Sequence, residues 1–256
     1  MVGKYFGLKN IPERTEKVRQ SGLTMVMDKG LSLREAEDFV DSVHQYVDIV
    51  KLGFGTSALT TKLKEKIALY RQANIRCYLG GTLFEAFVAR QQMHDYERLV
   101  ESLQLDLVEI SDGCLEIDHA QKCSYIQYFA KNFTVLSEVG SKDKDKILPP
   151  YKWIELMNAE LSVGAWKVIA EAREGGNIGI YRSTGEVRMG LIDEILTKVA
   201  AENIIWESPI KAQQDWFIKL LGANVNLGNI APSEVIALET LRLGLRGDTF
   251  FQYLDK

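Results

Sequence analysis

Eight short apolar segments recur along the chain, and each is separated from the next by a longer stretch with the pattern of a helix. The segments are rich in β-branched and aliphatic residues and end near glycine, aspartate or proline, which is typical of buried parallel strands. We expect the strands at residues 23–27, 47–52, 76–79, 105–110, 133–139, 166–172, 204–207 and 224–227.

Start signals mark several of the intervening helices. They are capping boxes at Ser32 with Glu35 and at Thr82 with Glu85, and an N-cap with following proline at Ser208-Pro209. Eight strand–helix units in 256 residues predict a single (β/α)8 TIM barrel over residues 1–256, with residues 1–20 as an N-terminal lead-in. An open doubly wound sheet is the alternative, but the regular alternation without a break in composition favours a closed barrel.

Composition excludes several classes of protein. The chain has 31 Lys and Arg against 35 Asp and Glu, and this scattered charge, −4 net, disfavours nucleic-acid binding. No apolar run approaches the roughly 20 residues that span a bilayer, so we expect no membrane contact. The start of the chain lacks the apolar segment of a secretory signal, and the three cysteines show no C-x-x-C spacing. A cytoplasmic protein without disulfides is the expectation.

Polar side chains gather at the carboxyl ends of the predicted strands. Because side chains alternate between the two faces of a strand, Glu171 and Arg173 share a face with Ile169, and the opposite face is apolar. The same reasoning points further side chains into the barrel: Lys29, Lys51, Glu109, Glu138, Glu207 and Asn226. TIM-barrel active sites are built at this end. A network of ion pairs that merely plugs the barrel is the structural alternative, since buried charges are costly unless they are paired.

Carboxylates among cations predict a site where a metal ion joins the protein to an anionic small molecule. Mg²⁺ prefers such oxygen ligands and usually takes one or two carboxylates plus waters. We expect it among Glu109, Glu138, Glu171 and Glu207.

Glycine-rich turns follow several of the strands and would let the backbone approach an anion. They lie at residues 53–55, 80–82, 175–176 and 228–229. TIM barrels often bind phosphate after strands seven and eight. We therefore expect a phosphate near Lys211, Gly228 and Asn229.

These polar strand ends lie within longer segments that follow one another in a recognisable order. They are GLT at 22–24, DKG at 28–30, VKLGFGTS at 50–57, GGTLFE at 80–85, VEISDG at 108–113, SEVG at 137–140 followed by Lys142-Asp143, EAREGG at 171–176, NVNLGNI at 224–230 and LETLRLGLRGDT at 238–249. With them the sequence resembles the phosphosulfolactate synthase family over nearly its whole length, from about residue 22 to 251.

The resemblance implies a barrel enzyme that adds sulfite to C3 of phosphoenolpyruvate, with Mg²⁺, and gives (2R)-O-phospho-3-sulfolactate for coenzyme M biosynthesis, by carbon–sulfur lyase chemistry. It implies a lysine just after the fifth strand, here Lys142, as the general acid that protonates C2. The full set expected to act is Lys142, Arg173, Lys51 and Lys29 in catalysis, with Lys211, Asn226, Gly228, Asn229, Gly81 and Thr82 binding substrate.

Two positions depart from the family pattern near the expected substrate. Phe54 stands where the family usually has Trp, and Gly228 where it often has Ala. The family also includes bacterial members without evident coenzyme M metabolism and heat-stress-associated plant relatives. An enzyme using another nucleophile or enol phosphate, and a non-catalytic stress protein, are therefore the alternatives.

Aromatic side chains near the carboxyl terminus predict a homo-oligomer, which the resemblance also implies. Phe250, Phe251 and Tyr253 must be covered in some way, and packing back onto their own barrel is the alternative to a subunit contact.

Overall fold

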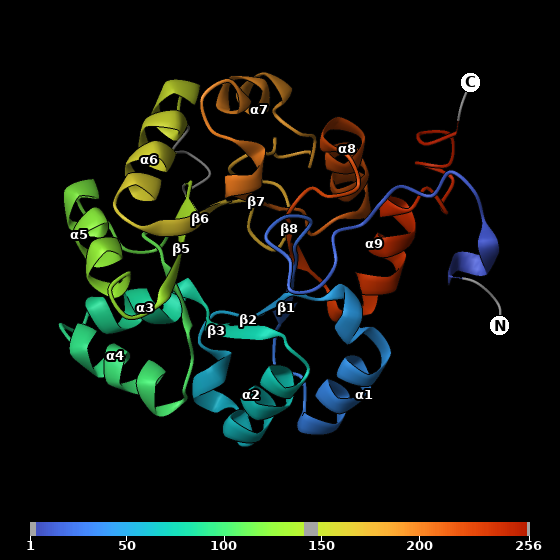
Figure 1. Ribbon diagram of the computed structural model, residues 1–256. Helices are drawn as coiled ribbons and strands as arrows, with labels where there is room; N and C mark the ends of the chain where they lie inside the picture. The colour runs from blue at the N-terminus through green and yellow to red at the C-terminus, as the bar shows by residue number, and fades with distance from the viewer. Residues whose placement is uncertain (1–3, 141–147, 255–256) are drawn as a thin grey trace.

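Eight parallel strands surrounded by helices form the molecule in a computed structural model, which describes residues 4–140 and 148–254 (Figure 1). The strands are β1 (Thr24–Asp28), β2 (Ile49–Leu52), β3 (Arg76–Leu79), β4 (Leu107–Ile110), β5 (Thr134–Val139), β6 (Ala165–Ala170), β7 (Ile204–Glu207) and β8 (Leu227–Ile230). Each strand lies within three residues of its predicted start, so the spacing of apolar segments identified all eight.

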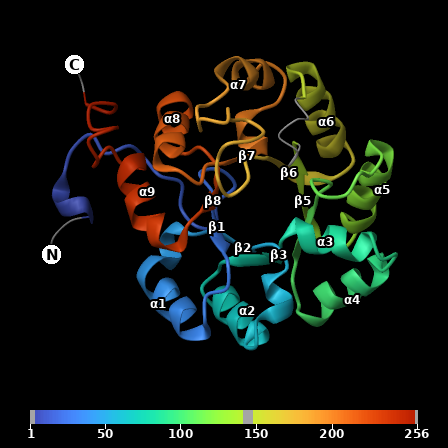
Figure 2. The ribbon, with the colours of Figure 1, turned by 180° about the vertical axis from the view of Figure 1, so that it is seen from behind.

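Helices cover the outside of the strands on all sides, as the view from behind also shows (Figure 2). They are α1 (Leu33–Val43), α2 (Leu63–Gln72), α3 (Gly81–Val88), α4 (Met93–Ser102), α5 (His119–Phe129), α6 (Pro150–Ser162), α7 (Met189–Leu196), α8 (Lys211–Leu221) and α9 (Val235–Arg242). Short 3-10 turns lie at Lys4–Gly7, His44–Tyr46, Thr56–Leu59, Ala201–Asn203 and Pro232–Glu234. No helix in the described part of the chain is long and apolar enough to cross a membrane.

The first and last strands pair with each other, which confirms the TIM barrel over an open sheet. The parallel ladders run in the order β3-β2-β1-β8-β7-β6-β5-β4. At the remaining seam β3 and β4 lie side by side, and side chains bridge them. Arg76 Nε donates to Asp106 at 3.0 Å, and the Tyr78 hydroxyl donates to Glu109 at 2.7 Å.

The two faces of each strand enter two separate apolar cores. The outward face packs against the helices in a large core that includes Val168 and Ala170. The inward face forms a small core inside the barrel, built from Leu23, Met25, Ile49, Tyr78, Leu107, Leu136, Ile169 and Ile205. This inner layer is the floor beneath the polar side chains that follow on the same face, so the predicted parity of Ile169 with Glu171 is confirmed.

The last strand lies three residues later than predicted, which moves one expected site residue to the other end of the barrel. Asn226 precedes β8, and its Oδ1 accepts from the Leu23 N–H at 3.0 Å. Its Nδ2 donates to the carbonyls of Glu202 and Ile204, both at 3.0 Å. The prediction that Asn226 lies at a carboxyl end is wrong. The sequence also predicted a glycine-rich turn at residues 228–229, but Gly228 lies in β8 and pairs with Glu207 of β7.

Helix starts agree with the sequence only in part. Ser32 and Glu35 form the expected capping box at α1. At α3 the N-cap is Gly80, so the box at Thr82 is wrong, and Glu85 instead receives hydrogen bonds from the loop after β4. The start predicted at Ser208 is also wrong, because α8 begins at Lys211.

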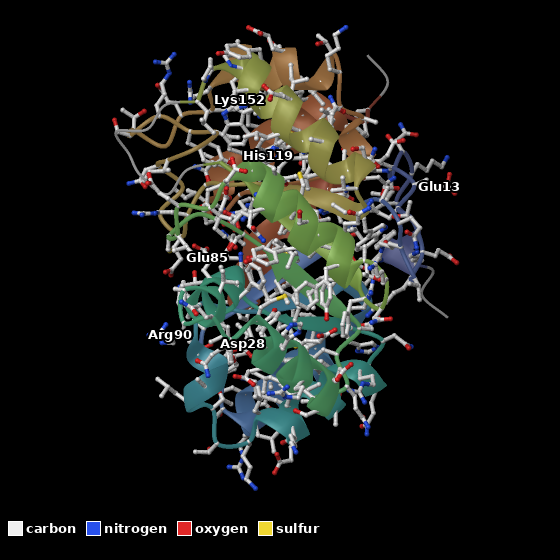
Figure 3. The ribbon with its side chains drawn as sticks, turned by 90° about the vertical axis from the view of Figure 1, so that its left-hand side faces the viewer. Glu13, Asp28, Glu85, Arg90, His119 and Lys152 are labelled. Carbon is white, nitrogen blue, oxygen red and sulfur yellow. The ribbon has the colours of Figure 1, made fainter. Side chains whose placement is uncertain are left out.

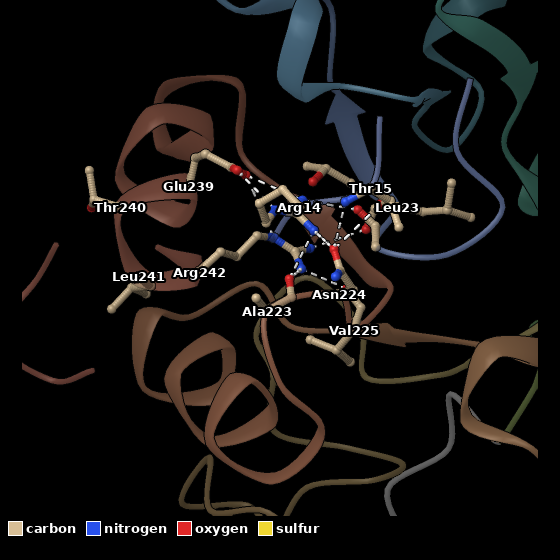
Figure 4. A network of polar contacts seen from close by, with 12 residues as sticks. Arg14, Thr15, Leu23, Ala223, Asn224, Val225, Glu239, Thr240, Leu241 and Arg242 are labelled. Atoms are coloured by element: carbon tan, nitrogen blue, oxygen red, sulfur yellow. Dashed lines mark hydrogen bonds and ion pairs between the residues drawn. The ribbon is translucent and has the colours of Figure 1, made fainter. Parts of the chain in front are cut away.

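The lead-in crosses the amino-terminal end of the barrel and is fastened there by arginines (Figure 4). Arg14 Nε donates to Glu239 of α9 at 2.9 Å, and the other guanidinium nitrogens of Arg14 bind the carbonyls of Gly22 and Ala223 and the Asn224 side chain. Arg242 binds the carbonyls of Ala223, Val225 and Leu23. This cluster joins both ends of the chain to the strands, and the two described termini lie beside α9 (Figure 1).

Candidate active site

A cavity of about 490 Å³ opens at the carboxyl ends of the strands, and every strand or the segment that follows it contributes to the cavity wall. The lining residues are Met27, Lys51, Phe54, Thr82, Cys114, Glu138, Glu171, Arg173, Glu174, Gly175, Asn177, Glu207 and Asn229. Cavities of about 660 and 600 Å³ lie at the opposite end, against the lead-in. We take the carboxyl-terminal cavity as the site because buried charges converge there, at the end where TIM barrels place their chemistry.

Three buried carboxylates meet in this cavity. Glu138, Glu171 and Glu207 each place an oxygen within 4.8 Å of the other two, and their exposure is at most 3%. Consecutive backbone N–H groups after β6 orient two of them. Ala172 N donates to Glu207 Oε2 at 2.9 Å, and Arg173 N donates to Glu171 Oε1 at 2.6 Å. We call these three residues the carboxylate triad.

Arg173 holds an unusual backbone conformation while it orients Glu171. Its φ is +55°, a region that residues with a Cβ rarely enter. A non-glycine residue kept in this region at a cavity wall is typical of a functional constraint. The guanidinium of Arg173 lines the same cavity, so this residue serves the site with both its backbone and its side chain.

A single buried lysine lies beside the triad. Lys51 Nζ is 3.2 Å from Glu138 Oε2, 3.6 Å from Glu207 Oε1 and 3.0 Å from Glu109 Oε2. Burial alone would lower the pKa of Lys51. The surrounding carboxylates, Glu109 above all, outweigh burial and hold the pKa of Lys51 well above its usual value, so its ammonium is charged.

Glu109 differs from the other three carboxylates that we expected to hold a metal. Its Oε1 accepts from the Gly81 N–H at 2.7 Å, and its Oε2 accepts from the Tyr78 hydroxyl at 2.7 Å and contacts Lys51. The residue is fully buried. Glu109 is thus placed as the fixed counter-ion of Lys51, and it lies outside the triad.

The negative charge of the cluster exceeds its positive charge among the described residues. The triad and Glu109 supply four carboxylates, against the ammonium of Lys51 and the guanidinium of Arg173 at the wall. Burial raises the pKa of Glu207 to about 7, Lys51 opposes this rise, and Glu138 adds to it. This excess of negative charge fits a site that binds a cation. It fits less well a network of balanced ion pairs that only plugs the barrel.

The structure distributes the other predicted site residues unevenly. Thr82 and Asn229 line the cavity. Gly81 adjoins it, and a Cβ at Gly81 would lie 2.3 Å from Glu109 Oε1, so only glycine fits there. Lys29 does not line the cavity, and its half-exposed side chain pairs with Glu174 at 2.6 Å. Lys142 lies outside the described residues.

Of the three residues expected near a phosphate after β7 and β8, Asn229 lines the cavity, whereas Lys211 and Gly228 do not. Lys211 starts α8, and its ammonium pairs with Asp248 at 2.6 Å. A Cβ on Gly228 would lie 2.6 Å from Met25 Cε, so this glycine faces the packed interior of the barrel. Gln213 of α8 binds the carbonyls of Gly176 and Gly185, and thereby packs the loop after β6 against the start of the helix.

Polar clusters behind the sheet support the cavity, and sequence reasoning missed them. One is built around Glu85 of α3, which Figure 3 labels. Glu85 accepts from the Ser111 hydroxyl and from the N–H groups of Cys114 and Leu115, which places Cys114 at the cavity wall. Lys122 donates to the Glu138 carbonyl at 2.5 Å and pairs with Glu160 at 3.0 Å. Among the supporting residues, Tyr78 inside the barrel, which donates to Glu109, is the one with a usable signal in the sequence, because period-two alternation points it inward.

Comparisons with known proteins show which family the chain belongs to. The family model of (2R)-phospho-3-sulfolactate synthase (ComA) matches residues 12–248. The chain belongs to this family. It is 43% identical over 244 residues to the phosphosulfolactate synthase of Methanothermobacter thermautotrophicus, with 93% of this chain and 95% of the relative covered. It is 41% identical to that of Bacillus subtilis, covering 94% and 97% of the two chains.

Two more distant proteins are also similar to this chain. Protein HEAT-STRESS-ASSOCIATED 32 of Arabidopsis thaliana is 22% identical over 94% of this chain and 93% of its own. Among solved structures, 3-hexulose-6-phosphate synthase from Salmonella typhimurium superposes with a TM-score of 0.56 at 16% identity, covering 88% of this chain and all of the other. That likeness shows the fold alone, whereas the synthase relatives indicate that this family member is an enzyme.

The family segments recognised in the sequence converge on the cavity. Segments 50–57, 137–140, 171–176 and 224–230 each supply lining residues. The departure at Phe54 falls on the wall, and its φ is +54°. The departure at Gly228 falls one residue before Asn229, below the wall. The segment 238–249 lies elsewhere, since Glu239 and Arg242 belong to the amino-terminal cluster.

Proposed function

We propose that this enzyme adds sulfite to C3 of phosphoenolpyruvate and forms (2R)-O-phospho-3-sulfolactate, by carbon–sulfur lyase chemistry. The observation that carries the proposal is the cavity at the strand ends, where the carboxylate triad lies beside Lys51 and Arg173. The volume of about 490 Å³ suits a small anion. Family membership supplies the substrate class.

The triad suits Mg²⁺ as the resident cofactor. Its donors are hard carboxylate oxygens, which this ion prefers, and they lie close enough together to share one ion. The Asn229 Oδ1 is a further buried oxygen at the same wall, and it accepts no hydrogen bond from the described residues. The ion would supply positive charge to the carboxylate of phosphoenolpyruvate and so favour negative charge developing there.

The protein's own groups would bind and orient the two anions. The Arg173 guanidinium can hold a carboxylate or phosphate through two parallel hydrogen bonds. Lys51, and Lys29 once it leaves Glu174, would neutralise sulfite as it approaches an anionic partner. We omit Lys211 and Gly228 from the phosphate site, because one pairs with Asp248 and the other faces the packed interior.

The reaction needs one new bond and one proton. The sulfur lone pair attacks C3, the π electrons of the C2–C3 bond move toward the carboxylate, and C2 then takes up a proton while no group leaves. We propose Lys142 as the donor of this proton. In the sequence, Lys142 comes three residues after the end of β5, and Glu138 of that strand lines the cavity.

Product formation tests the proposal directly. The purified chain is incubated with sulfite, phosphoenolpyruvate and Mg²⁺, and phosphosulfolactate is sought by mass spectrometry. We expect product with the wild type and none with Lys142→Ala, while Lys64→Ala, at an exposed lysine of α2, behaves as the wild type. Consumption of phosphoenolpyruvate only with another nucleophile would contradict sulfite as the substrate. A wild-type rate in Lys142→Ala would contradict the role of that lysine.

We also propose that the chain is a cytoplasmic homo-oligomer. Its three cysteines are free, which suits a reducing compartment. Phe250 and Phe251 remain 49% and 75% exposed and contact each other edge to face, whereas Tyr253 packs near Gly244. Light scattering at micromolar concentration should give a multiple of the 28.9 kDa chain mass, and a monomer mass would contradict the oligomer.

A further inference from the structure

We propose that the Lys51 ammonium and the divalent cation compete for the same carboxylates, so that metal binding is an exchange in which Lys51 gives up its contacts with the triad. This inference deepens the proposed function and rests on the triad being the cation site. It concerns the order of binding in the cavity. Lys51 pairs with two carboxylates of the triad when no ion is bound, and it leaves them when the ion binds.

The first step in the argument is the position of the ammonium. Lys51 Nζ lies 3.2 Å from Glu138 Oε2 and 3.6 Å from Glu207 Oε1, so it contacts two of the three members of the triad. A Mg²⁺ ion bound to those oxygens would lie about 2.1 Å from them. The two cations would then be only a few ångströms apart in a buried region, where like charges repel strongly.

The second step is that Lys51 has another partner to which it can remain attached. Glu109 Oε2 is 3.0 Å from Nζ, the shortest of the three ion-pair distances. Glu109 itself is fixed by the Tyr78 hydroxyl and the Gly81 N–H. Lys51 can therefore turn from the triad toward Glu109 without becoming a buried, unpaired charge.

The third step is that two of the three carboxylates of the triad are oriented without Lys51. The N–H groups of Ala172 and Arg173 hold one oxygen each of Glu207 and Glu171. Lys122 holds the Glu138 carbonyl from behind the sheet. The carboxylates of Glu171 and Glu207 therefore keep their places when the ammonium withdraws, and the main chain that carries Glu138 stays fixed. A cation that replaces the ammonium meets a largely preformed site. The ammonium, still charged, would then be available to an incoming anion.

Direct measurement of metal binding tests the exchange. Mn²⁺ binding to the full chain, in the absence of substrates, is followed by electron paramagnetic resonance and calorimetry. We expect Lys51→Met to bind Mn²⁺ roughly tenfold more tightly than the wild type, or more, because the resident competitor is gone. Lys51→Arg, which keeps the charge, should bind no more tightly than the wild type.

Lys66→Met is the matched control. Lys66 is also fully buried and paired with a carboxylate, Asp28 at 2.7 Å, but it lies on α2 and contacts Leu31 O instead of the triad. Its loss should leave the Mn²⁺ affinity unchanged within about twofold. Equal tightening in Lys66→Met and Lys51→Met would overturn the exchange, because it would trace the effect to lost buried charge in general.

Each remaining outcome also decides the matter. If metal-free Lys51→Met is unfolded, Mn²⁺ that restores its native circular dichroism supports the exchange, and failure to restore it overturns the exchange. Unchanged or weaker Mn²⁺ binding in Lys51→Met overturns it, as does absence of binding in both proteins. Because no substrate is present, the result is separate from the proposed function. A wild type that makes phosphosulfolactate can still refute the exchange, and the exchange can hold in a chain that makes none.

Discussion

Both ends of the barrel bury charged side chains, but the two clusters balance their charges differently. At the amino-terminal end, Arg14 and Arg242 meet Glu239, and most of their guanidinium hydrogen bonds go to backbone carbonyls (Figure 4). At the carboxyl-terminal end, Lys51 pairs with Glu109, Glu138 and Glu207, and three backbone N–H groups donate to carboxylates of the cluster. Both clusters border a cavity, but the arginines at the amino-terminal end bind mainly to the backbone, whereas at the carboxyl-terminal end carboxylates lie close to one another.

The difference separates structural from functional use of buried charge. A buried ion pair stabilises little unless hydrogen bonds satisfy its remaining atoms. In the amino-terminal cluster every guanidinium nitrogen of Arg14 and both terminal nitrogens of Arg242 make hydrogen bonds, which fasten the lead-in and α9 to the strands. The carboxyl-terminal cluster keeps like charges close together, and this arrangement costs stability. Such a cost is typical of sites that are completed by a ligand. The following predictions test this division, from the largest expected effect to the smallest.

Arg14→Met should cost about 3–5 kcal/mol of unfolding free energy and leave turnover per folded molecule unchanged. It leaves the buried Glu239 without its closest cation and removes donors from the carbonyls of Gly22 and Ala223. Urea denaturation measures the first effect and steady-state kinetics at low temperature the second. A loss of kcat in a variant of unchanged stability would mean that the two ends are not separate in function.

Metal-free protein should lose stability as the pH rises from about 5 to 8. The pKa of Glu207 is raised from 4.5 to about 7, so the folded state holds a proton that the unfolded state has released. Folding therefore weakens with rising pH, by at most about 1.4 kcal/mol per pH unit and roughly 3 kcal/mol in all. Thermal unfolding with a chelator present measures the slope, and Glu207→Gln should flatten it. An equal slope in that variant would assign the effect to another group.

Glu207→Gln should lower the rate of phosphosulfolactate formation roughly a hundredfold, about 2.7 kcal/mol, without lowering stability at pH 8. The amide oxygen still accepts from Ala172 N, while the repulsion from Glu138 disappears. The matched change at the other end, Glu239→Gln, should do the reverse and lower stability while sparing kcat. Similar behaviour of the two variants would remove the contrast between the clusters.

Arg173→Gly should be about 1 kcal/mol more stable than Arg173→Ala, although both lack the guanidinium. At φ +55° a Cβ is strained and glycine is not. Both variants should lose affinity for phosphoenolpyruvate to the same degree, because the backbone N–H that holds Glu171 remains in each. Melting temperatures and KM values give the comparison. Equal melting temperatures would show that the backbone at this position is unstrained.

The local periodicity of the sequence determined the barrel architecture of this protein. Alternation along each strand sorted inner from outer faces, so Ile169 and Glu171 point inward while Val168 joins the helix-facing core. The pattern repeats every two residues, and no distant part of the chain is needed to interpret it. The barrel, and the end of it where charges gather, follow from that repetition.

Only the tertiary structure decided which side chains meet. Glu109 follows the same alternation as Glu138, but Tyr78 and Gly81 hold it apart from the triad. Lys211 pairs with Asp248, which lies 37 positions away in the sequence, and it does not line the cavity. Asn226 lies at the opposite end because β8 starts one residue after it. Distances across a barrel depend on the stagger of its strands and the paths of its loops, and these are set by packing between segments far apart in the sequence.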